Sequence, residues 1–159
     1  MSLDVAIAPV KKSVIVKTTP AHAFEVFTAG IDRWWPKDRH IGESPATRAI
    51  IEPRAGGRWY TEHTDGGEVT SGHVLAWEPP HRVVFSWEIN GDWKPEPNRA
   101  FASEVEVRFT SKDGGTLVEL EHRKFERMAG DGGAKMHGAV EGGWVGVLAL
   151  FSAAAESGF

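Results

Sequence analysis

The chain has 159 residues, of which 41% are hydrophobic and 25% charged, and its formal net charge is -4 at pH 7. These values are typical of one globular domain with enough apolar side chains for a core, and they exclude a disordered chain. The acidic balance gives no electrostatic basis for binding nucleic acid or an anionic membrane, and the absence of cysteine excludes disulfides, thiolate nucleophiles and cysteine-based zinc sites.

The N-terminus does not have the pattern of a signal peptide, because Asp4 and Pro9 interrupt its short apolar patch. We therefore expect a cytoplasmic protein with a single domain over residues 1–159, of which 1–11 are an N-terminal extension. The first strand is predicted at 12–18, KSVIVKT.

A helix is predicted directly after this strand. Thr19 can cap it, Pro20 suits its first position, and Phe24 and Phe27 lie one turn apart. The pattern predicts one short helix, or two with a break near Gly30.

From about residue 48 the hydrophobic periodicity changes to two, which indicates strands. Six are predicted, separated by hairpin turns: 48–53, 57–63, 69–79, 81–89, 102–111 and 116–125. Val105, Val107 and Phe109 share one face of their strand, and charged residues occupy the other, which predicts one buried and one solvated face. Strand 57–63 cannot be oriented, because both of its faces mix polar and aromatic residues.

The last helix is predicted around GGWVGVLALF, residues 142–151. This apolar run is bracketed by Glu141 and Glu156 and contains three glycines, so it is too short to span a membrane. Trp144 and Phe151 belong to a stripe of large apolar residues that is expected to face the core.

A second stripe on this helix consists of small residues, Gly142, Gly146 and Ala149. Glycine in a helix costs roughly 1 kcal/mol of stability relative to alanine, so we expect the small residues of this stripe to have a structural or functional role. It either lets the helix pack closely on the sheet or leaves space for a ligand. The glycine-rich segment 129–143 before it is interpreted as a flexible hinge.

Five segments together resemble a known family: VFTAGIDRWWP, IIEPRAGGRWYTE, GHVLAWEPPHRVVFSW, GGTLVELEH and GGWVGVLALF. They are similar to the bacterial branch of the SRPBCC, or START-like, superfamily that is named after the activator of the heat-shock chaperone ATPase. The resemblance implies the helix-grip fold of the α+β class, in which a curved antiparallel sheet of about six or seven strands surrounds a long C-terminal helix. It also implies one or two short helices after the first strand and a hydrophobic cavity between sheet and helix.

The seven tryptophans are the main compositional signal for a ligand site, because an indole supplies a large rigid surface and one N–H donor. Trp34 and Trp35 are expected at the rim or lid of the cavity, whereas Trp93 is expected at the surface. The full set of cavity candidates is Trp34, Trp35, Trp59, His73, Trp87, His122, Trp144, Gly146 and Phe151.

Alternation places only two of the seven histidines, His73 and His122, on the inner face. Each is either a hydrogen-bonded core residue or a polar contact or general base for a ligand. The sequence contains no HExxH and no GxSxG motif, so we expect no metal site, no cofactor and no activated serine.

Three functions follow from these observations. The leading hypothesis is a small apolar-ligand binding domain without demonstrable catalysis, whose partner is a hydrophobic or aromatic small molecule. The resemblance adds a co-chaperone-like module with a chaperone or homodimer partner. The third hypothesis is an enzyme of the cyclase or lyase type that uses His73 or His122. No nucleic acid and no membrane span is expected.

Overall fold

The computed structural model describes residues 7–37 and 44–157, which form seven strands, two α-helices and three short 3-10 helices. The strands are β1 (Val10–Val16), β2 (Ala46–Ile51), β3 (Arg58–His63), β4 (Glu68–Glu78), β5 (Arg82–Trp87), β6 (Ser103–Lys112) and β7 (Gly115–Arg123). The helices are α1 (Pro20–Phe27), η1 (Ile31–Arg33), η3 (Arg99–Phe101), η4 (Phe125–Arg127) and α2 (Gly132–Glu156).

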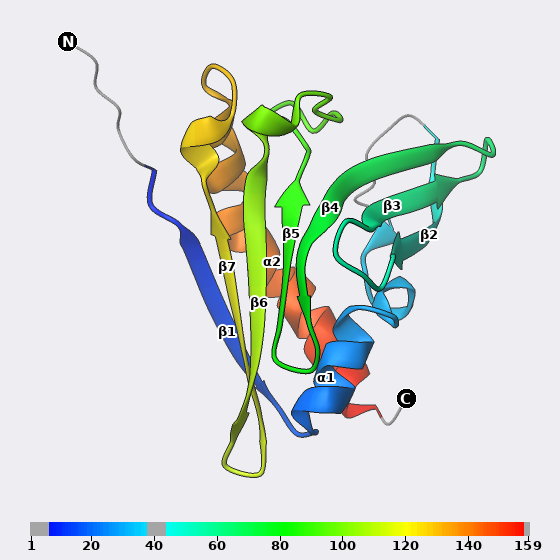
Figure 1. Cartoon of the computed structure of the whole chain (residues 1–159), viewed down its shortest axis with the longest axis vertical. Coiled ribbons are helices and arrows are strands. Elements are labelled where there is room, and N and C mark those ends of the chain that lie inside the picture. The colour runs from blue at the N-terminus through cyan, green and yellow to red at the C-terminus, as the bar shows by residue number, and fades with distance from the viewer. Residues whose placement is uncertain (1–6, 38–43, 158–159) are drawn as a thin grey trace.

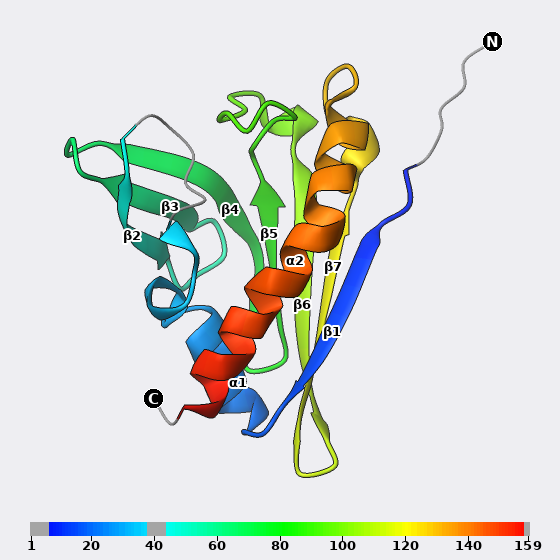
Figure 2. The same cartoon turned by 180° about the vertical axis from the view of Figure 1, so that it is seen from behind.

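All seven strands belong to one antiparallel sheet with the order β1-β7-β6-β5-β4-β3-β2. The sheet is curved, and α2 crosses its concave side diagonally, with α1 beside the C-terminal end of α2 (Figures 1 and 2). The predicted helix-grip arrangement is therefore confirmed.

The helix after β1 forms where its capping residues predict. The Thr19 hydroxyl accepts a hydrogen bond from the backbone N–H of His22, and Pro20 occupies the first turn. Phe24 and Phe27 are both buried against the core, which fixes α1 at the lower end of the sheet.

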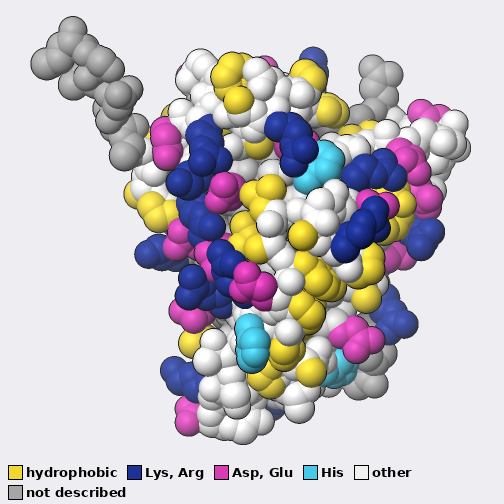
Figure 3. Space-filling model, viewed as in Figure 1, with side chains coloured by type: hydrophobic (Ala, Val, Ile, Leu, Met, Phe, Trp, Pro, Cys, Tyr) yellow, Lys and Arg dark blue, Asp and Glu magenta, His cyan; other side chains and the backbone are white. Residues whose placement is uncertain are grey.

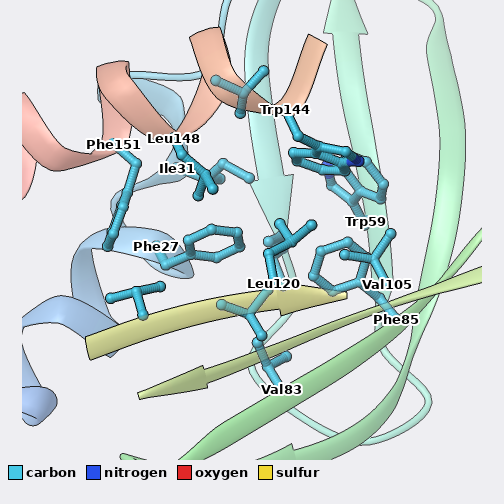
Figure 4. Packing of buried hydrophobic residues seen from close by; sticks show 14 of the residues in the cluster. Phe27, Ile31, Trp59, Val83, Phe85, Val105, Leu120, Trp144, Leu148 and Phe151 are labelled. Atoms are coloured by element: carbon cyan, nitrogen blue, oxygen red, sulfur yellow. The ribbon is translucent and has the colours of Figure 1, made fainter. Parts of the chain in front are cut away.

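The large apolar stripe of α2 faces the core as predicted. Trp144, Leu148 and Phe151 are buried between the helix and the sheet (Figure 4). By length and composition α2 could cross a membrane. Because these side chains pack under the sheet, α2 has the burial of a core helix in a soluble domain.

The small-residue stripe of α2 faces away from the sheet, so both of its predicted roles are wrong. Gly142, Gly146 and Ala149 are exposed, and the larger Val145 and Leu150 lie exposed beside them. The stripe brings neither the helix backbone close to the sheet nor space to a buried ligand.

The predicted hinge is also wrong, because α2 begins at Gly132 and runs unbroken through this segment. A Cβ atom on Gly91 would lie only 2.6 Å from the Cα of Gly132. Glycine therefore permits a close contact between the loop after β5 and the first turn of α2.

The convex face of the sheet carries ion pairs rather than a uniformly solvated surface. Lys, Arg, Asp and Glu side chains gather over its β1, β7 and β6 side (Figure 3). Glu106 is buried at the centre of this group, where it accepts hydrogen bonds from Arg82, Arg108 and Arg123. Burial alone would raise the pKa of Glu106, but the three guanidinium groups lower it to about 2.

Candidate functional site

A cavity of about 320 Å³ lies between α2 and the β3–β5 part of the sheet. Its lining is mainly apolar, and it includes five of the seven tryptophans: Trp35, Trp59, Trp87, Trp93 and Trp144. Its polar lining residues are Lys37, Thr61 and Ser71, and the Lys37 ammonium is paired with Asp32.

Four of these tryptophans contact one another in a closed ring. The ring centroids are 5.4 Å apart for Trp35 and Trp59, and 5.6 Å for Trp59 and Trp87. They are 5.7 Å apart for Trp87 and Trp144, and 6.1 Å for Trp144 and Trp35. The contact between Trp59 and Trp87 is tilted, and the other three are edge-to-face. Such aromatic pairs stabilise one another, so the wall is formed before a ligand enters. We call Trp35, Trp59, Trp87 and Trp144 the tryptophan ring.

Strand β3 supplies one wall because its residues alternate between the two faces of the sheet. Trp59, Thr61 and His63 are buried, and the first two line the cavity. Arg58 lies on the other face, where its guanidinium stacks 4.0 Å from the Tyr60 ring and bonds to Glu68. The orientation of this strand, which the sequence left open, is thereby settled.

His73 lies on the convex face, away from the cavity, so its predicted inward position is wrong. The register of β4 shifts between Val74 and Ala76, and the shift places Val74 and Trp77 on the same face. The imidazole of His73 instead contacts the carboxylate of Glu88, with 2.7 Å between Nδ1 and Oε2.

His122 is fully buried, as predicted, but it lies behind the cavity wall. The Trp144 indole N–H donates to its Nδ1 at 3.1 Å, so Nε2 carries the proton and donates to the Ser103 hydroxyl at 2.8 Å. Burial, and to a smaller extent the neighbouring His137, lowers the pKa of His122 to about 3. The ring is neutral and positions Trp144.

Three more cavity candidates belong elsewhere. Trp34 is a core residue whose indole N–H donates to the Val26 carbonyl at 2.8 Å, and it packs on Phe151. Gly146 is exposed on α2. Of the nine candidates, the four members of the tryptophan ring line the cavity.

On α2 the residue that leaves space is Gly143. It lines the cavity, and a Cβ atom there would meet no other atom within 4 Å. It could not be distinguished by sequence from the exposed Gly142 beside it, because the two differ only in their rotation about the helix axis.

Trp93 at the cavity mouth was also missed as a lining residue. It is 43% exposed, packs on Trp87 and has a φ of 59°, in the left-handed region that bulky residues avoid. The Asn90 side chain holds this turn by accepting hydrogen bonds from the backbone N–H groups of Asp92 and Lys94. The turn thus fixes an aromatic side chain at the entrance.

Two donors behind the cavity wall have no acceptor among the residues that the structure describes. The indole N–H groups of Trp59 and Trp87 are buried, and neither has a hydrogen-bond partner there. An unpaired buried donor costs about 1–3 kcal/mol of stability.

A hydroxyl and an imidazole form a contact at the β3 wall. His63 is buried, its Nε2 lies 2.7 Å from the Thr61 hydroxyl oxygen, and its Nδ1 lies 2.7 Å from the Ser44 carbonyl oxygen. The mixed composition of β3 concealed this pair in the sequence. Among residues 7–37 and 44–157, no three His, Asp or Glu side chains are grouped so that they could hold a metal ion.

Comparison with known proteins places this geometry in a family. Residues 17–156 match the family described as activator of Hsp90 ATPase homolog 1-like protein. No curated protein sequence matches the chain.

Among solved structures, an anthrahydroquino-Gama-pyrone synthase, Txn09, complexed with SUM is 40% identical, with a TM-score of 0.65 over 94% of this chain and 97% of that one. The self-sacrificing resistance protein CalC from Micromonospora echinospora is 27% identical, with a TM-score of 0.68 over 95% and 97% of the two chains. The Aha1 dimer from Colwellia psychrerythraea is 15% identical, with a TM-score of 0.65 over 96% and 98%, and shows the shared fold alone.

Proposed function

This chain belongs to the family of activator of Hsp90 ATPase homolog 1-like proteins, and we propose that its cavity binds a planar, oxygenated, polycyclic aromatic molecule. The observation that carries the proposal is the cavity of about 320 Å³ walled by the tryptophan ring and Trp93. Its volume lies within the usual range of small-molecule sites, about 300–1,000 Å³.

The chemistry of the wall supports this ligand class. Flat indole surfaces favour flat aromatic ligands, and the few polar groups select for oxygen atoms at their edge. The hydroxyls of Thr61 and Ser71 can donate or accept a hydrogen bond. Carbonyl and phenol oxygens on a fused ring system can pair with these hydroxyls, whereas a plain hydrocarbon cannot.

A second candidate function is a ring-forming reaction on such a molecule. It is favoured by the 40% identity with the synthase, whose name indicates an oxygenated polycyclic aromatic. A rigid aromatic cavity promotes ring closure by holding a chain in its folded conformation. His73 and His122 do not serve this reaction, because one lies on the convex face and the other behind the wall.

The co-chaperone hypothesis stays a prediction. The likeness to the Aha1 dimer is at 15% identity and supports only the fold. Co-purification with a heat-shock chaperone would test it.

Ligand binding can be measured by the quenching of tryptophan fluorescence with 2-hydroxyanthraquinone. We expect saturable quenching in the wild-type protein and at least about tenfold weaker binding in Gly143→Leu, because a leucine there occupies the cavity. Gly142→Leu is the matched control, since its side chain points into open solvent on the same helix. Equal binding by both variants, or no binding by the wild type, would contradict the proposal.

A further inference from the structure

The contact between Thr61 and His63 has the geometry of a hydroxyl paired with a base. The Ser44 carbonyl can only accept a hydrogen bond, so the His63 Nδ1 that faces it at 2.7 Å carries a proton. In the neutral ring, Nε2 is then the unprotonated nitrogen, whose lone pair accepts a hydrogen bond. The Thr61 hydroxyl, 2.7 Å from Nε2, is its donor.

Thr61 connects this base to the cavity. Among the described residues, Thr61 lines the cavity and His63 does not, so the Thr61 hydroxyl lies between a bound molecule and the imidazole. Because that hydroxyl gives its proton to His63, its oxygen is available to accept a hydrogen bond from a ligand. Ser71, the other hydroxyl of the lining, has no imidazole hydrogen-bonded to it among the described residues.

The turn between β3 and β4 places an ionised carboxylate near this pair. A hydrogen bond from the backbone N–H of Gly67 is the largest cause that lowers the pKa of Asp65, and its electrostatic interaction with His63 contributes to the lowering. Asp65 is therefore ionised at neutral pH.

We infer that Thr61 and His63 form a proton relay that removes the proton of an acidic hydroxyl on a ligand bound in the cavity. This inference rests on the proposed ligand class, since a phenol or enol supplies such a hydroxyl.

The relay is a single concerted transfer. The ligand O–H bond breaks as a new O–H bond forms at Thr61 Oγ1, and the original Thr61 proton forms a bond to His63 Nε2. The products are a ligand oxyanion that accepts from the neutral Thr61 hydroxyl and an imidazolium that donates at Nδ1 to Ser44. No threonine alkoxide is formed, so the high pKa of a hydroxyl is not a barrier.

The relay also fits the second candidate function. A phenolate or enolate is a far better nucleophile than its neutral form, and ring closure through oxygen or carbon requires such a nucleophile. In this role Thr61 contacts the reacting molecule, and His63 acts through it.

The test uses the colour change of 2-hydroxyanthraquinone, whose phenolate absorbs at longer wavelength than the phenol. In the wild-type protein the phenolate band of the bound probe should persist to a pH about one unit lower than in Thr61→Val or His63→Gln. Thr61→Val keeps the shape of the side chain without the hydroxyl, and His63→Gln can accept a hydrogen bond but cannot take a proton. Thr110→Val, the same substitution at an exposed position of β6 outside the cavity lining, should keep the wild-type band.

Binding is measured separately by fluorescence quenching, so loss of the band is distinguished from loss of the probe. A wild-type band in His63→Gln would overturn the relay. Absence of quenching in the wild type would overturn the proposed ligand class instead. In that case nitrogen NMR of the unliganded protein still decides, because the relay requires the proton of neutral His63 on Nδ1, and a proton found on Nε2 refutes it.

Discussion

His122 should make the protein lose stability in mild acid. Its pKa is lowered from 6.5 to about 3 by burial, so the unfolded chain takes up a proton below about pH 6.5 that the folded chain refuses. Since the unfolded state binds more protons, stability falls as pH falls through this window. Protonation in the fold would also place an N–H on Nδ1 against the indole N–H of Trp144.

The magnitude follows from the two pKa values. A pH of about 5 lies about 1.5 units below the pKa of the histidine in the unfolded chain, while the folded ring is still neutral at this pH. This difference corresponds to a loss of about 2 kcal/mol in the free energy of unfolding. Glu106 adds little at this pH, because its pKa falls from 4.5 to about 2 and its own loss begins only near pH 4.5.

Urea unfolding followed by fluorescence at about pH 7.5 and about pH 5 measures the loss. The wild type should lose about 2 kcal/mol more than His122→Gln between these pH values. His81→Gln, at an exposed turn position, should keep the wild-type dependence. If His122→Gln and the wild type lose stability equally, the reasoning about the buried neutral ring is refuted.

Three further predictions concern the scaffold and the cavity mouth. Trp93→Gly should be about 1 kcal/mol more stable than Trp93→Ala, because glycine tolerates the positive φ at this position. Both variants should bind 2-hydroxyanthraquinone more weakly than the wild type. Equal urea midpoints for the two variants would argue against backbone strain at Trp93. Between about pH 6 and pH 3 the free energy of unfolding of the wild type, measured by urea titrations, should fall by about 2 kcal/mol more than that of Glu106→Gln. The fold stabilises only the ionised form of the Glu106 carboxylate, so this stabilisation is lost when the carboxylate is protonated. Gly72→Ala should unfold at a much lower temperature than the wild type, because its Cβ would collide with the Ser86 carbonyl. Gly138→Ala, on the open side of α2, should instead gain about 1 kcal/mol of stability. An unchanged melting temperature in Gly72→Ala would show that β4 can shift to accommodate the Cβ.

The accuracy of the sequence-based predictions follows the regularity of each element. Alternation oriented β6 and β7 correctly because their pairing has no register shift, so Val105 and His122 lie opposite each other on the inner face. The same rule failed for His73, because the bulge in β4 changes which alternate residues face inward. No residue type in the sequence indicates this bulge. Both faces of β3 mix polar and aromatic residues, so alternation could not show which face is buried, and Thr61 and His63 could not be placed.

The helix and the loops failed for a different reason. Composition shows that α2 has one stripe of large and one of small residues, but not that the small one would face solvent. The role of Gly143 depends on a rotation of the helix that the packing of Trp144 and Phe151 decides. Trp93 enters the cavity wall only because the loop after β5 contacts Gly132, a contact between residues far apart in the chain.

The polar contacts behind the wall indicate how the cavity would select its ligand. Trp144 is held by His122, Trp93 by the turn around Asn90, and Trp35 by the ring edges of Trp59 and Trp144. These side chains are therefore fixed before binding, so little conformational entropy is lost when a flat molecule enters. A molecule that does not match the shape must break these contacts, at a cost of several kcal/mol. Selection would then come from the shape of a preformed aromatic wall, and chemistry from the Thr61 hydroxyl, which has the His63 imidazole behind it.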